Sequence, residues 1–310
     1  PCLKKAGFSF LFIYTFEYLV TLIGRMVHYI HSEFNTAFTR HLTLLLEIDL
    51  YAFTYCLYNS TDGNIAVIKK VDFNMQRQDT FHFEKFQAAI HTEDLLHCPF
   101  AAQFISIAGG PFTLIPAPLF QSNLMDKYLD LTYTSGFDAA EHSVFIAPIE
   151  AVNVYRIPHK LSYFIAKVFK NANLHHICNA LIKRAHAYAE NNEGTNLFAE
   201  IRSGYFYIML FKNRELLLLN KFDYTNKEDF LYFILLVCDQ FKIDRTTDTL
   251  ILSGDILEGS VLYNELYKFF MQIRFMPADN FFYLPEALEL PVHTINGLLS
   301  LHLCASYQEI

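Results

Sequence analysis

One short stretch of the sequence gathers several side chains that could bind a metal ion. The segment HTEDLLHC contains two histidines, two carboxylates and a thiol, namely His91, Glu93, Asp94, His97 and Cys98. At helical spacing Asp94 shares a face with both histidines and the cysteine, and these are ligand types that zinc accepts. The segment equally fits the polar end of a helix that stops before a proline. We favour this second interpretation and predict no metal site.

The signatures of several common enzymes are absent from the sequence. It contains no P-loop G-x-x-x-x-G-K, no dinucleotide-binding G-x-G-x-x-G and no nucleophile elbow G-x-S-x-G. We therefore predict no catalytic residue, and we expect no enzyme activity of these classes.

Composition limits the class of protein and its partners. Of 310 residues, 53% are hydrophobic and 18% are charged, which is enough apolar material for the cores of two domains. A formal net charge of -8 argues against nucleic acid as a partner. The cysteines are scattered and none forms a C-x-x-C motif: Cys2, Cys56, Cys98, Cys178, Cys238 and Cys304. This pattern predicts reduced thiols and a cytoplasmic location.

Residues 1–41 differ from the rest of the chain and are treated as an N-terminal extension. An apolar run of nearly membrane-spanning length follows two lysines, but Glu17 and Arg25 interrupt it. Three alternatives stay open: a helix on a membrane surface, a helix packed on the body, and a non-native or poorly ordered extension. Membrane association is expected only through residues 1–40.

A hairpin begins the regular part of the chain. Residues 47–58 are rich in aromatic and β-branched residues, Asp62-Gly63 supplies a turn, and residues 65–73 return as a second strand. We predict a helix over residues 83–96, stopped by Pro99. Two further strands are expected, at residues 100–110 and 111–120, the second of them closed by prolines.

A second copy of this pattern follows about 150 residues later. Five positions match their counterparts in the first copy: Leu44, Glu47, Ile48, Phe53 and Leu57 match Leu197, Glu200, Ile201, Phe206 and Leu210. Thr225 and Glu228 form a capping box that opens a helix. Residues 249–260 then parallel residues 103–110, with Gly254 on or near Gly110. Residues 281–288 parallel residues 112–119, with Pro285 on Pro116.

The same order of elements in both copies predicts an internal duplication. Each copy should be a mixed sheet flanked by helices. Between the copies we predict two short strands, a helix with Pro158 at its first position, a strand over residues 174–177 and a helix that ends before Gly194.

Two tandem copies with an insertion between them resemble the actin-like ATPase superfamily. The likeness is greatest to its pilus-assembly and type II secretion branch and to a bacterial family of unknown function with an actin-like fold. It covers residues 42–310, and its best local match is LILSGDILEGSVLYNEL, which resembles the adenosine motif. The resemblance implies an α/β fold of the actin-like ATPase type, a duplicated ribonuclease H-like fold. It divides the chain into a first lobe (42–140), an inserted subdomain with a connecting helix (141–194) and a second lobe (195–310).

The resemblance also implies a nucleotide cleft between the lobes. Such proteins hold magnesium with a strand-end acid and phosphates with a glycine-containing turn. In the first turn Glu47 or Asp49 would be the acid, but Leu50 and Tyr51 replace the small polar residues of the family pattern.

The second turn keeps an acid, a hydroxyl and a glycine in Glu200, Ser203 and Gly204, yet Arg202 stands where the family has glycine. Arg202 would either exclude a phosphate or contact it. The adenosine turn is Ser253-Gly254-Asp255, in which the carboxylate replaces a second glycine. The candidate cleft residues are therefore Glu47, Asp49, Glu200, Ser203, Gly204, Ser253, Gly254 and Asp255. They predict a degenerate cleft that binds no cofactor, or one that binds Mg-ATP if the cleft still functions.

Two functions therefore stay open, together with a membrane-associated version of them. The first is a protein-interaction or scaffold module, without ATP hydrolysis, that binds a protein or peptide through the cleft, the insertion or a strand edge. The second is an ATP-binding switch or weak ATPase that uses Glu47, Glu200 and the turn at Gly254.

Overall fold

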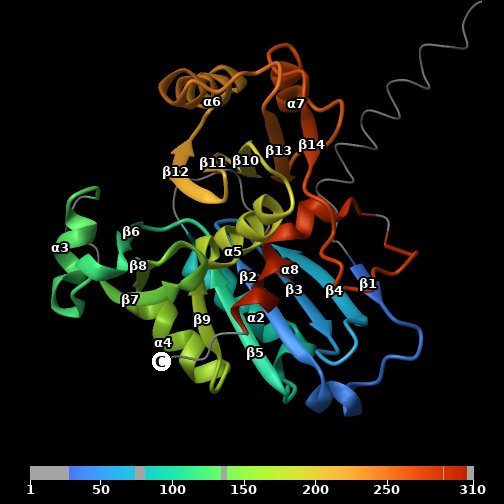
Figure 1. The fold of residues 1–310 in the computed structure, drawn as a ribbon. Coiled ribbons are helices and arrows are strands. Elements are labelled where there is room, and N and C mark those ends of the chain that lie inside the picture. The colour runs from blue at the N-terminus through green and yellow to red at the C-terminus, as the bar shows by residue number, and fades with distance from the viewer. Residues whose placement is uncertain (1–27, 74–80, 134–137, 289, 306–310) are drawn as a thin grey trace, which may run out of the picture.

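The computed structural model describes residues 28–73, 81–133, 138–288 and 290–305. Their strands form three sheets with helices packed on them, which confirms the predicted mixed α/β class (Figure 1). Most of the predicted N-terminal extension lies outside these ranges. Within them no helix combines the length and the apolar character needed to cross a membrane.

The first sheet has six strands in the order β1-β4-β3-β2-β5-β9. Their bounds are β1 His28–Ile30, β2 Thr43–Ile48, β3 Ala52–Tyr58, β4 Ile65–Asp72, β5 Ala102–Ile107 and β9 Asn173–His176. The hairpin strands pair antiparallel, whereas β2, β5 and β9 run parallel. Strand β1 pairs with β4, so the sheet includes residues from the segment treated as an extension.

The second sheet repeats this order in five strands, β12-β11-β10-β13-β14. Their bounds are β10 Thr195–Arg202, β11 Tyr205–Lys212, β12 Glu215–Asp223, β13 Thr249–Gly254 and β14 Ile273–Phe275. The pairing is again antiparallel through β12, β11 and β10 and parallel through β10, β13 and β14. The sheet therefore has the strand order and directions of β4-β3-β2-β5-β9.

The register corrects one detail of the predicted match between the copies. Gly254 lies opposite Ile201, and Ile107 lies opposite Ile48, the counterpart of Ile201. Gly254 therefore corresponds to Ile107 and not to Gly110. A turn glycine can fall at different distances past the end of a strand, so it is a poor marker of register.

The third sheet is small, with the order β6-β8-β7 and helix α3 against it. Its elements are β6 Phe112–Pro116, α3 Met125–Asp130, β7 Ala139–Ile146 and β8 Ala151–Pro158. This subdomain includes β6, which the sequence places in the first lobe. Pro158 ends β8 and caps the next helix, so it precedes the first helical position where the sequence puts it.

Helices cover the sheets and connect them. The α-helices outside the small sheet are α2 Phe83–Thr92, α4 His159–Val168, α5 Ile177–Glu190, α6 Lys227–Phe241, α7 Val261–Tyr267 and α8 Asn296–Ser300. The short 3-10 helices are η1 Thr36–His41, η2 Asp94–His97, η3 Ala117–Leu119, η4 Ser122–Leu124, η5 Ala147–Ile149, η6 Val292–Ile295 and η7 Leu301–Cys304.

The cap of α6 lies one residue later than predicted. The side chain of Asn226, not of Thr225, accepts a hydrogen bond from the backbone of Asp229 at 2.8 Å. Thr225 instead donates its hydroxyl proton to the Asp229 carboxylate at 2.6 Å. Asparagine is at least as good an N-cap as threonine, which explains why the helix begins there.

The predicted strand over residues 281–288 is wrong. This segment makes one isolated bridge, Asn64 to Tyr283, and β14 is the fifth strand of the second sheet. The rings of Phe281 and Phe282 lie 6.0 and 5.1 Å from that of Tyr58 in the first sheet. The packing of these rings on the first sheet thus holds the segment in place, although its local sequence pattern is typical of a strand.

The end of the chain packs on the first lobe. Residues from α8 and η7 share a buried cluster with Leu45, Cys56 and Phe104 of the first sheet. The sequence groups these C-terminal residues with the second lobe, yet the chain returns across the first sheet after β14.

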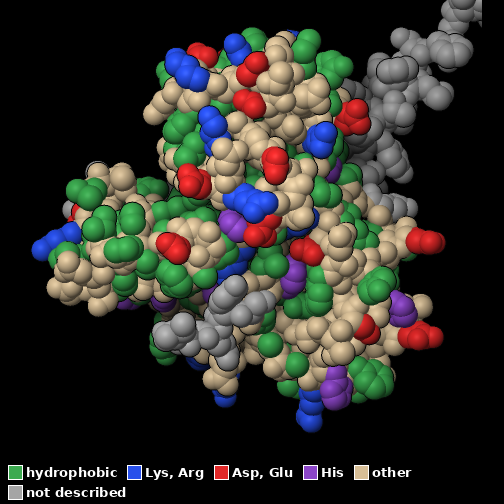
Figure 2. Space-filling view, viewed as in Figure 1, with side chains coloured by type: hydrophobic (Ala, Val, Ile, Leu, Met, Phe, Trp, Pro, Cys, Tyr) green, Lys and Arg blue, Asp and Glu red, His purple; other side chains and the backbone are tan. Residues whose placement is uncertain are grey.

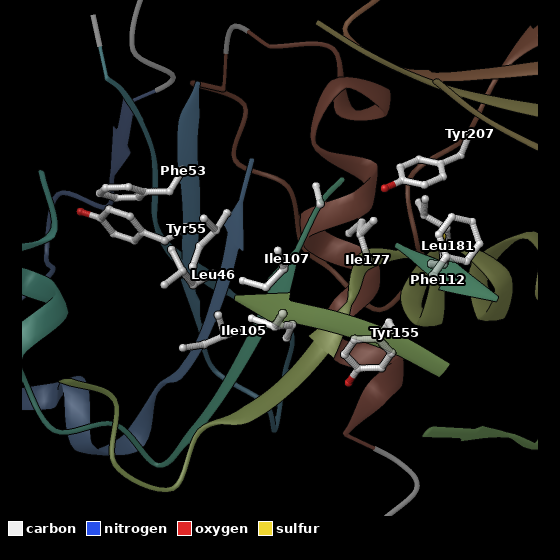
Figure 3. Close-up of a cluster of buried hydrophobic side chains, with 14 of the residues drawn as sticks. Leu46, Phe53, Tyr55, Ile105, Ile107, Phe112, Tyr155, Ile177, Leu181 and Tyr207 are labelled. Atoms are coloured by element: carbon white, nitrogen blue, oxygen red, sulfur yellow. The ribbon is translucent and has the colours of Figure 1, made fainter. Parts of the chain in front are cut away.

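The largest core continues from one lobe to the other. It joins Leu46 and Phe53 of the first sheet, Ile177 and Leu181 of α5, and Tyr207 of the second sheet (Figure 3). Helix α5 therefore lies between the two sheets. Their hairpin turns are held together by this packing, and the candidate site lies at that junction.

Candidate functional site

Equivalent strands bring a glutamate and a serine side by side in each lobe. Glu47 lies opposite Ser106 on the neighbouring parallel strand, and Glu200 lies opposite Ser253 in the same way. The next antiparallel strand of each sheet adds a lysine in the same row. This lysine is Lys70 of β4 in the first lobe and Lys221 of β12 in the second. The two lobes thus present matching rows of polar side chains at their junction.

Arg202 joins the two rows through its guanidinium group. Its two terminal nitrogens bind both carboxylate oxygens of Glu47, with Nη2 3.2 Å from Oε2. Nη2 also lies 2.7 Å from Oε1 of Glu200, and Nη1 lies 3.7 Å from Oδ2 of Asp49. The side chains of Arg202, Glu47 and Glu200 are only 8%, 7% and 1% exposed. This is a buried, bidentate ion pair across the lobes.

The surrounding side chains fix this cluster in place. The hydroxyl of Tyr205 donates to Asp49 Oδ1 at 2.6 Å, and Ser253 donates to Oε2 of Glu200. The Tyr224 hydroxyl donates to the backbone oxygen of Arg202 at 2.8 Å. Every carboxylate of the cluster therefore has a hydrogen-bond donor beside it.

The two glutamate–serine pairs differ because Arg202 approaches only one glutamate with both nitrogens. Both oxygens of Glu47 are bound to Arg202, and the buried Ser106 hydroxyl has no hydrogen-bond partner within the described ranges. Arg202 Nε is likewise buried and without a partner among those residues. The guanidinium group thus binds the carboxylates through its two terminal nitrogens.

Burial sets the protonation of the cluster. It raises the pKa of Glu200 to about 7, although Arg202 and the Ser253 hydroxyl favour the charged carboxylate. Burial also raises the pKa of Asp49, again against the effect of Arg202. For Arg202 itself burial disfavours the charge, but Glu47 and Glu200 outweigh it and hold the pKa well above the ordinary value. Arg202 is therefore a fixed cation, and Glu200 titrates near neutral pH.

The adenosine-like turn follows the cluster directly. Gly254 has a φ of 81°, and a β-carbon there would collide with the backbone oxygen of Ile201. The amide of Asp255 donates to that same oxygen at 2.8 Å. The Asp255 carboxylate lies 3.9 Å from Lys70 of the first lobe, which adds a further, weak link between the lobes.

The remaining predicted residues form the hairpin turn of the second lobe. Ser203 and Gly204 connect β10 to β11, and Gly204 adopts a φ of 91°. The backbone oxygen of Gly204 accepts from the amide of Tyr224 at 2.9 Å. Of the eight predicted residues, the structure thus gathers Glu47, Asp49, Glu200 and Ser253 around Arg202, with Gly254 and Asp255 next to them.

Sequence reasoning missed several residues of the junction, among them Tyr205, Tyr207 and Gly297. The Tyr207 hydroxyl accepts from the amide of Gly109 at 2.8 Å and so adds another hydrogen bond between the lobes, besides that from Tyr205 to Asp49. Both tyrosines sit in the period-two pattern of a strand, where an aromatic residue predicts core packing and not a polar contact. Aligning Ser106 with Ser253 in the repeat would have found the serine row.

Gly297 of α8 packs directly on the ion pair. A β-carbon at this position would lie 2.7 Å from Oε2 of Glu47, against Nη2 of Arg202 as well, and 3.3 Å from Ile177. No side chain larger than hydrogen fits there without moving the salt bridge.

We expect Gly297→Ala to destabilise the protein by about 1 kcal/mol in urea unfolding. Overpacking costs about 1–3 kcal/mol, and alanine recovers about 0.5–1 kcal/mol through its higher helix propensity. Combining it with Arg202→Ala provides the control, because the added methyl group then has room and its cost should shrink. Strictly additive effects would show that the methyl group does not meet the guanidinium.

The histidine-rich stretch is not arranged as a metal centre. The rings of His91 and His97 stack with centroids 6.2 Å apart, and His97 Nε2 lies 3.2 Å from the backbone oxygen of Ile90. Across the part of the chain that the structure describes, no three histidine, cysteine or carboxylate side chains converge to hold an ion. The carboxylates best suited to magnesium, Glu47, Asp49 and Glu200, surround Arg202 instead.

Comparison with known proteins identifies the fold and the family. Among solved structures, a Bacteroides thetaiotaomicron protein with an actin-like ATPase fold and unknown function has 22% identity and a TM-score of 0.71. The match covers 79% of this chain and 94% of that one. The PilM-PilN type IV pilus biogenesis complex matches with 11% identity and a TM-score of 0.59, over 87% of this chain and all of that one. None of the curated proteins matches.

These structural likenesses establish the actin-like fold that the sequence resemblance implies. The model of a family described as "Protein of unknown function (DUF3822)" matches residues 31–273, more than half of the chain. The match begins eleven residues before the predicted first lobe and includes the whole Arg202 cluster. The chain therefore belongs to the DUF3822 family of proteins of unknown function.

Proposed function

We propose that this protein is a degenerate actin-like module that binds a protein partner and does not hydrolyse ATP. The observation that carries the proposal is the position of Arg202 between the two hairpins. Its guanidinium is bound to Glu47 of one lobe and Glu200 of the other, where the resemblance implies magnesium and phosphate. The cluster thus supplies its own cation.

The charges and packing of the junction support this proposal. A phosphate entering the cluster would face Glu47, Asp49 and Glu200 and only one guanidinium, which is already paired. Repulsion by carboxylates is strong where water is excluded. Leu50 and Tyr51 follow Asp49 in the first turn, and Gly297 leaves no space behind the ion pair. Nucleotide binding would require this cluster to come apart.

A role in protein interaction is supported by one structural neighbour. PilM, which shares the fold, is seen in a complex with PilN in type IV pilus biogenesis. An actin-like scaffold can therefore serve to hold a protein, although a shared fold does not fix a function. We also propose a cytoplasmic location, supported by the free thiols of Cys56, Cys98, Cys178, Cys238 and Cys304.

We expect Mg-ATP to leave the melting temperature of the full chain unchanged relative to magnesium chloride alone. At about 5 mM nucleotide, a site with a Kd of about 0.1 mM would stabilise the fold by about 2 kcal/mol, a shift of several degrees. The absence of such a shift would support the degenerate cleft.

The competing function, an ATP-binding switch or weak ATPase, predicts the opposite. A rise of several degrees with Mg-ATP over magnesium chloride alone would contradict our proposal and establish a nucleotide site. ATP turnover that is lost in both Glu47→Ala and Glu200→Ala would show that hydrolysis has been kept.

A further inference from the structure

We propose that a pocket beside β1 binds an extended, basic segment of a partner protein. This inference rests on the proposed interaction role and gives it a location and a chemistry. The pocket has a volume of about 530 Å³ and lies between β1, the loop that follows it, the β3–β4 turn and residues 283–285. It is separate from the Arg202 cluster and from the inserted subdomain.

Aromatic side chains form the walls of this pocket. Tyr29 and Phe34 line it together with Phe38 and Tyr283, which are 60% and 69% exposed. Exposed aromatic rings at a concave site are good surfaces for the ammonium or guanidinium group of a ligand. They also accept the aliphatic stems of lysine and arginine side chains.

The walls are held by backbone contacts and so exist before a partner arrives. The amide of Tyr283 donates to the backbone oxygen of Gly63 at 3.1 Å, in the turn between β3 and β4. Gly63 has a φ of 72°, and a β-carbon there would collide with the backbone oxygen of Phe281. On the opposite side, Phe38 donates its amide proton to the oxygen of Asn35 at 3.0 Å. Preorganised walls reduce the entropy that binding must overcome.

The ionisable side chains in the pocket lining are one carboxylate, one histidine and two tyrosines. Glu33 lines it, and none of the described lining residues is lysine or arginine. Asp62 holds two lining residues, Asn59 and Asn64, and Glu286 follows a third, Pro285. No ion pair within the described ranges involves these three carboxylates, and Figure 2 shows acidic side chains together with histidines on this side of the molecule. A carboxylate beside aromatic walls complements a cationic ligand.

The sheet edge favours an extended segment. Strand β1 is the edge of the six-stranded sheet, and among the described residues it pairs only with β4. An unpaired strand edge is a template for an added strand. A basic segment lying along β1 could therefore place one side chain in the pocket.

The test is fluorescence anisotropy with the full chain and two labelled peptides. One peptide alternates arginine with leucine, and the other alternates glutamine with leucine. We expect the arginine peptide to bind and the glutamine peptide to bind at least about tenfold more weakly, a difference of about 1.4 kcal/mol. Glu33→Lys and Tyr283→Ala should each weaken the arginine peptide about fivefold to tenfold.

Matched controls separate the pocket from general attraction to an acidic protein. Asp239→Lys changes the net charge as Glu33→Lys does, and Tyr232→Ala removes a similarly exposed ring, both on α6. Neither should change the affinity by more than about twofold. Equal losses in the control variants, equal binding of the two peptides, or no binding at about 1 mM would overturn the inference. None of these results bears on the nucleotide test, so the two proposals can fail separately.

Discussion

Arg202→Ala is expected to destabilise the protein by about 3–5 kcal/mol in urea unfolding. The substitution leaves the buried carboxyl groups of Glu47 and Glu200 with no cation between them, so each must either stay ionised without a partner or take up a proton. An unpaired buried charge costs far more than the net value of the ion pair that it once formed. Because the cluster lies where the lobes meet, the whole protein should unfold at a lower midpoint concentration of urea.

Two variants show whether the pairing itself is responsible. Arg274→Ala removes an exposed arginine of β14 and should change stability by no more than about 0.5 kcal/mol. Adding Glu47→Gln to Arg202→Ala removes one of the stranded charges and should recover part of the loss, a coupling of about 0.5–3 kcal/mol. A loss in Arg202→Ala below about 1 kcal/mol would mean that the cluster is hydrated and that the junction is looser than the structure shows.

The similarity of the two hairpins in sequence predicted where two acids of this cluster lie in the sheets. Matching the two hairpins placed Glu47 and Glu200 at equivalent strand ends, and the register of both sheets agrees. Period-two patterns fix which side chains share a face, because slipping a strand by one residue would reverse them all. The strand order was not predicted, and the last strand of the second sheet, β14, lies outside the segment 281–288 that the sequence matched to the first copy.

The role of Arg202, the cation of the cluster, could not be predicted from the sequence. Arg202 and Glu47 are 155 positions apart, and nothing local to either residue shows that they meet. From the sequence alone Arg202 would either contact or exclude a phosphate, and which of the two holds depends on the carboxylates that the fold brings within its reach. Gly297 is harder still, because a lone glycine in a C-terminal apolar stretch gives no sign of a close approach.

The C-terminal segment shows a second limit of local patterns. The aromatic residues of segment 281–288 and its proline suit an edge strand as well as a loop packed on another surface. Tyr58 of the first sheet provides that surface. It lies so far from this segment in the sequence that no local pattern connects the two. Tertiary burial overrides a weak strand propensity in such cases.

The pH dependence of stability offers a second test with a large expected effect. The folded protein holds the pKa of Glu200 at about 7, above the model-compound value of 4.5, mainly because the side chain is buried. The folded state therefore binds this proton more tightly than the unfolded chain does. The stability that protonated Glu200 contributes is complete below about pH 4.5 and is lost as the pH rises through 7. Over that range the loss from this one group is about 3 kcal/mol.

Glu200→Gln should remove this dependence. The amide is neutral at every pH. Its oxygen can accept from Arg202, and its NH2 group can donate to the Ser253 hydroxyl oxygen once that hydroxyl, which donates to Glu200 in the natural protein, has rotated. Relative to the natural protein, the variant should gain about 3 kcal/mol of unfolding free energy between pH 4.5 and pH 8. Urea unfolding across that pH range measures the difference directly, and other titrating groups cancel because both proteins share them.

Glu193→Gln, at an exposed position, is the matched control and should follow the natural protein throughout. A difference curve for Glu200→Gln that stays flat would show that Glu200 is ionised across the whole range in the fold. One that favours the variant more at acid pH would mean that Glu200 stabilises the fold as a carboxylate. In that case Arg202 would be balanced by two full charges, and the cluster would be a stronger barrier to an incoming phosphate than we infer.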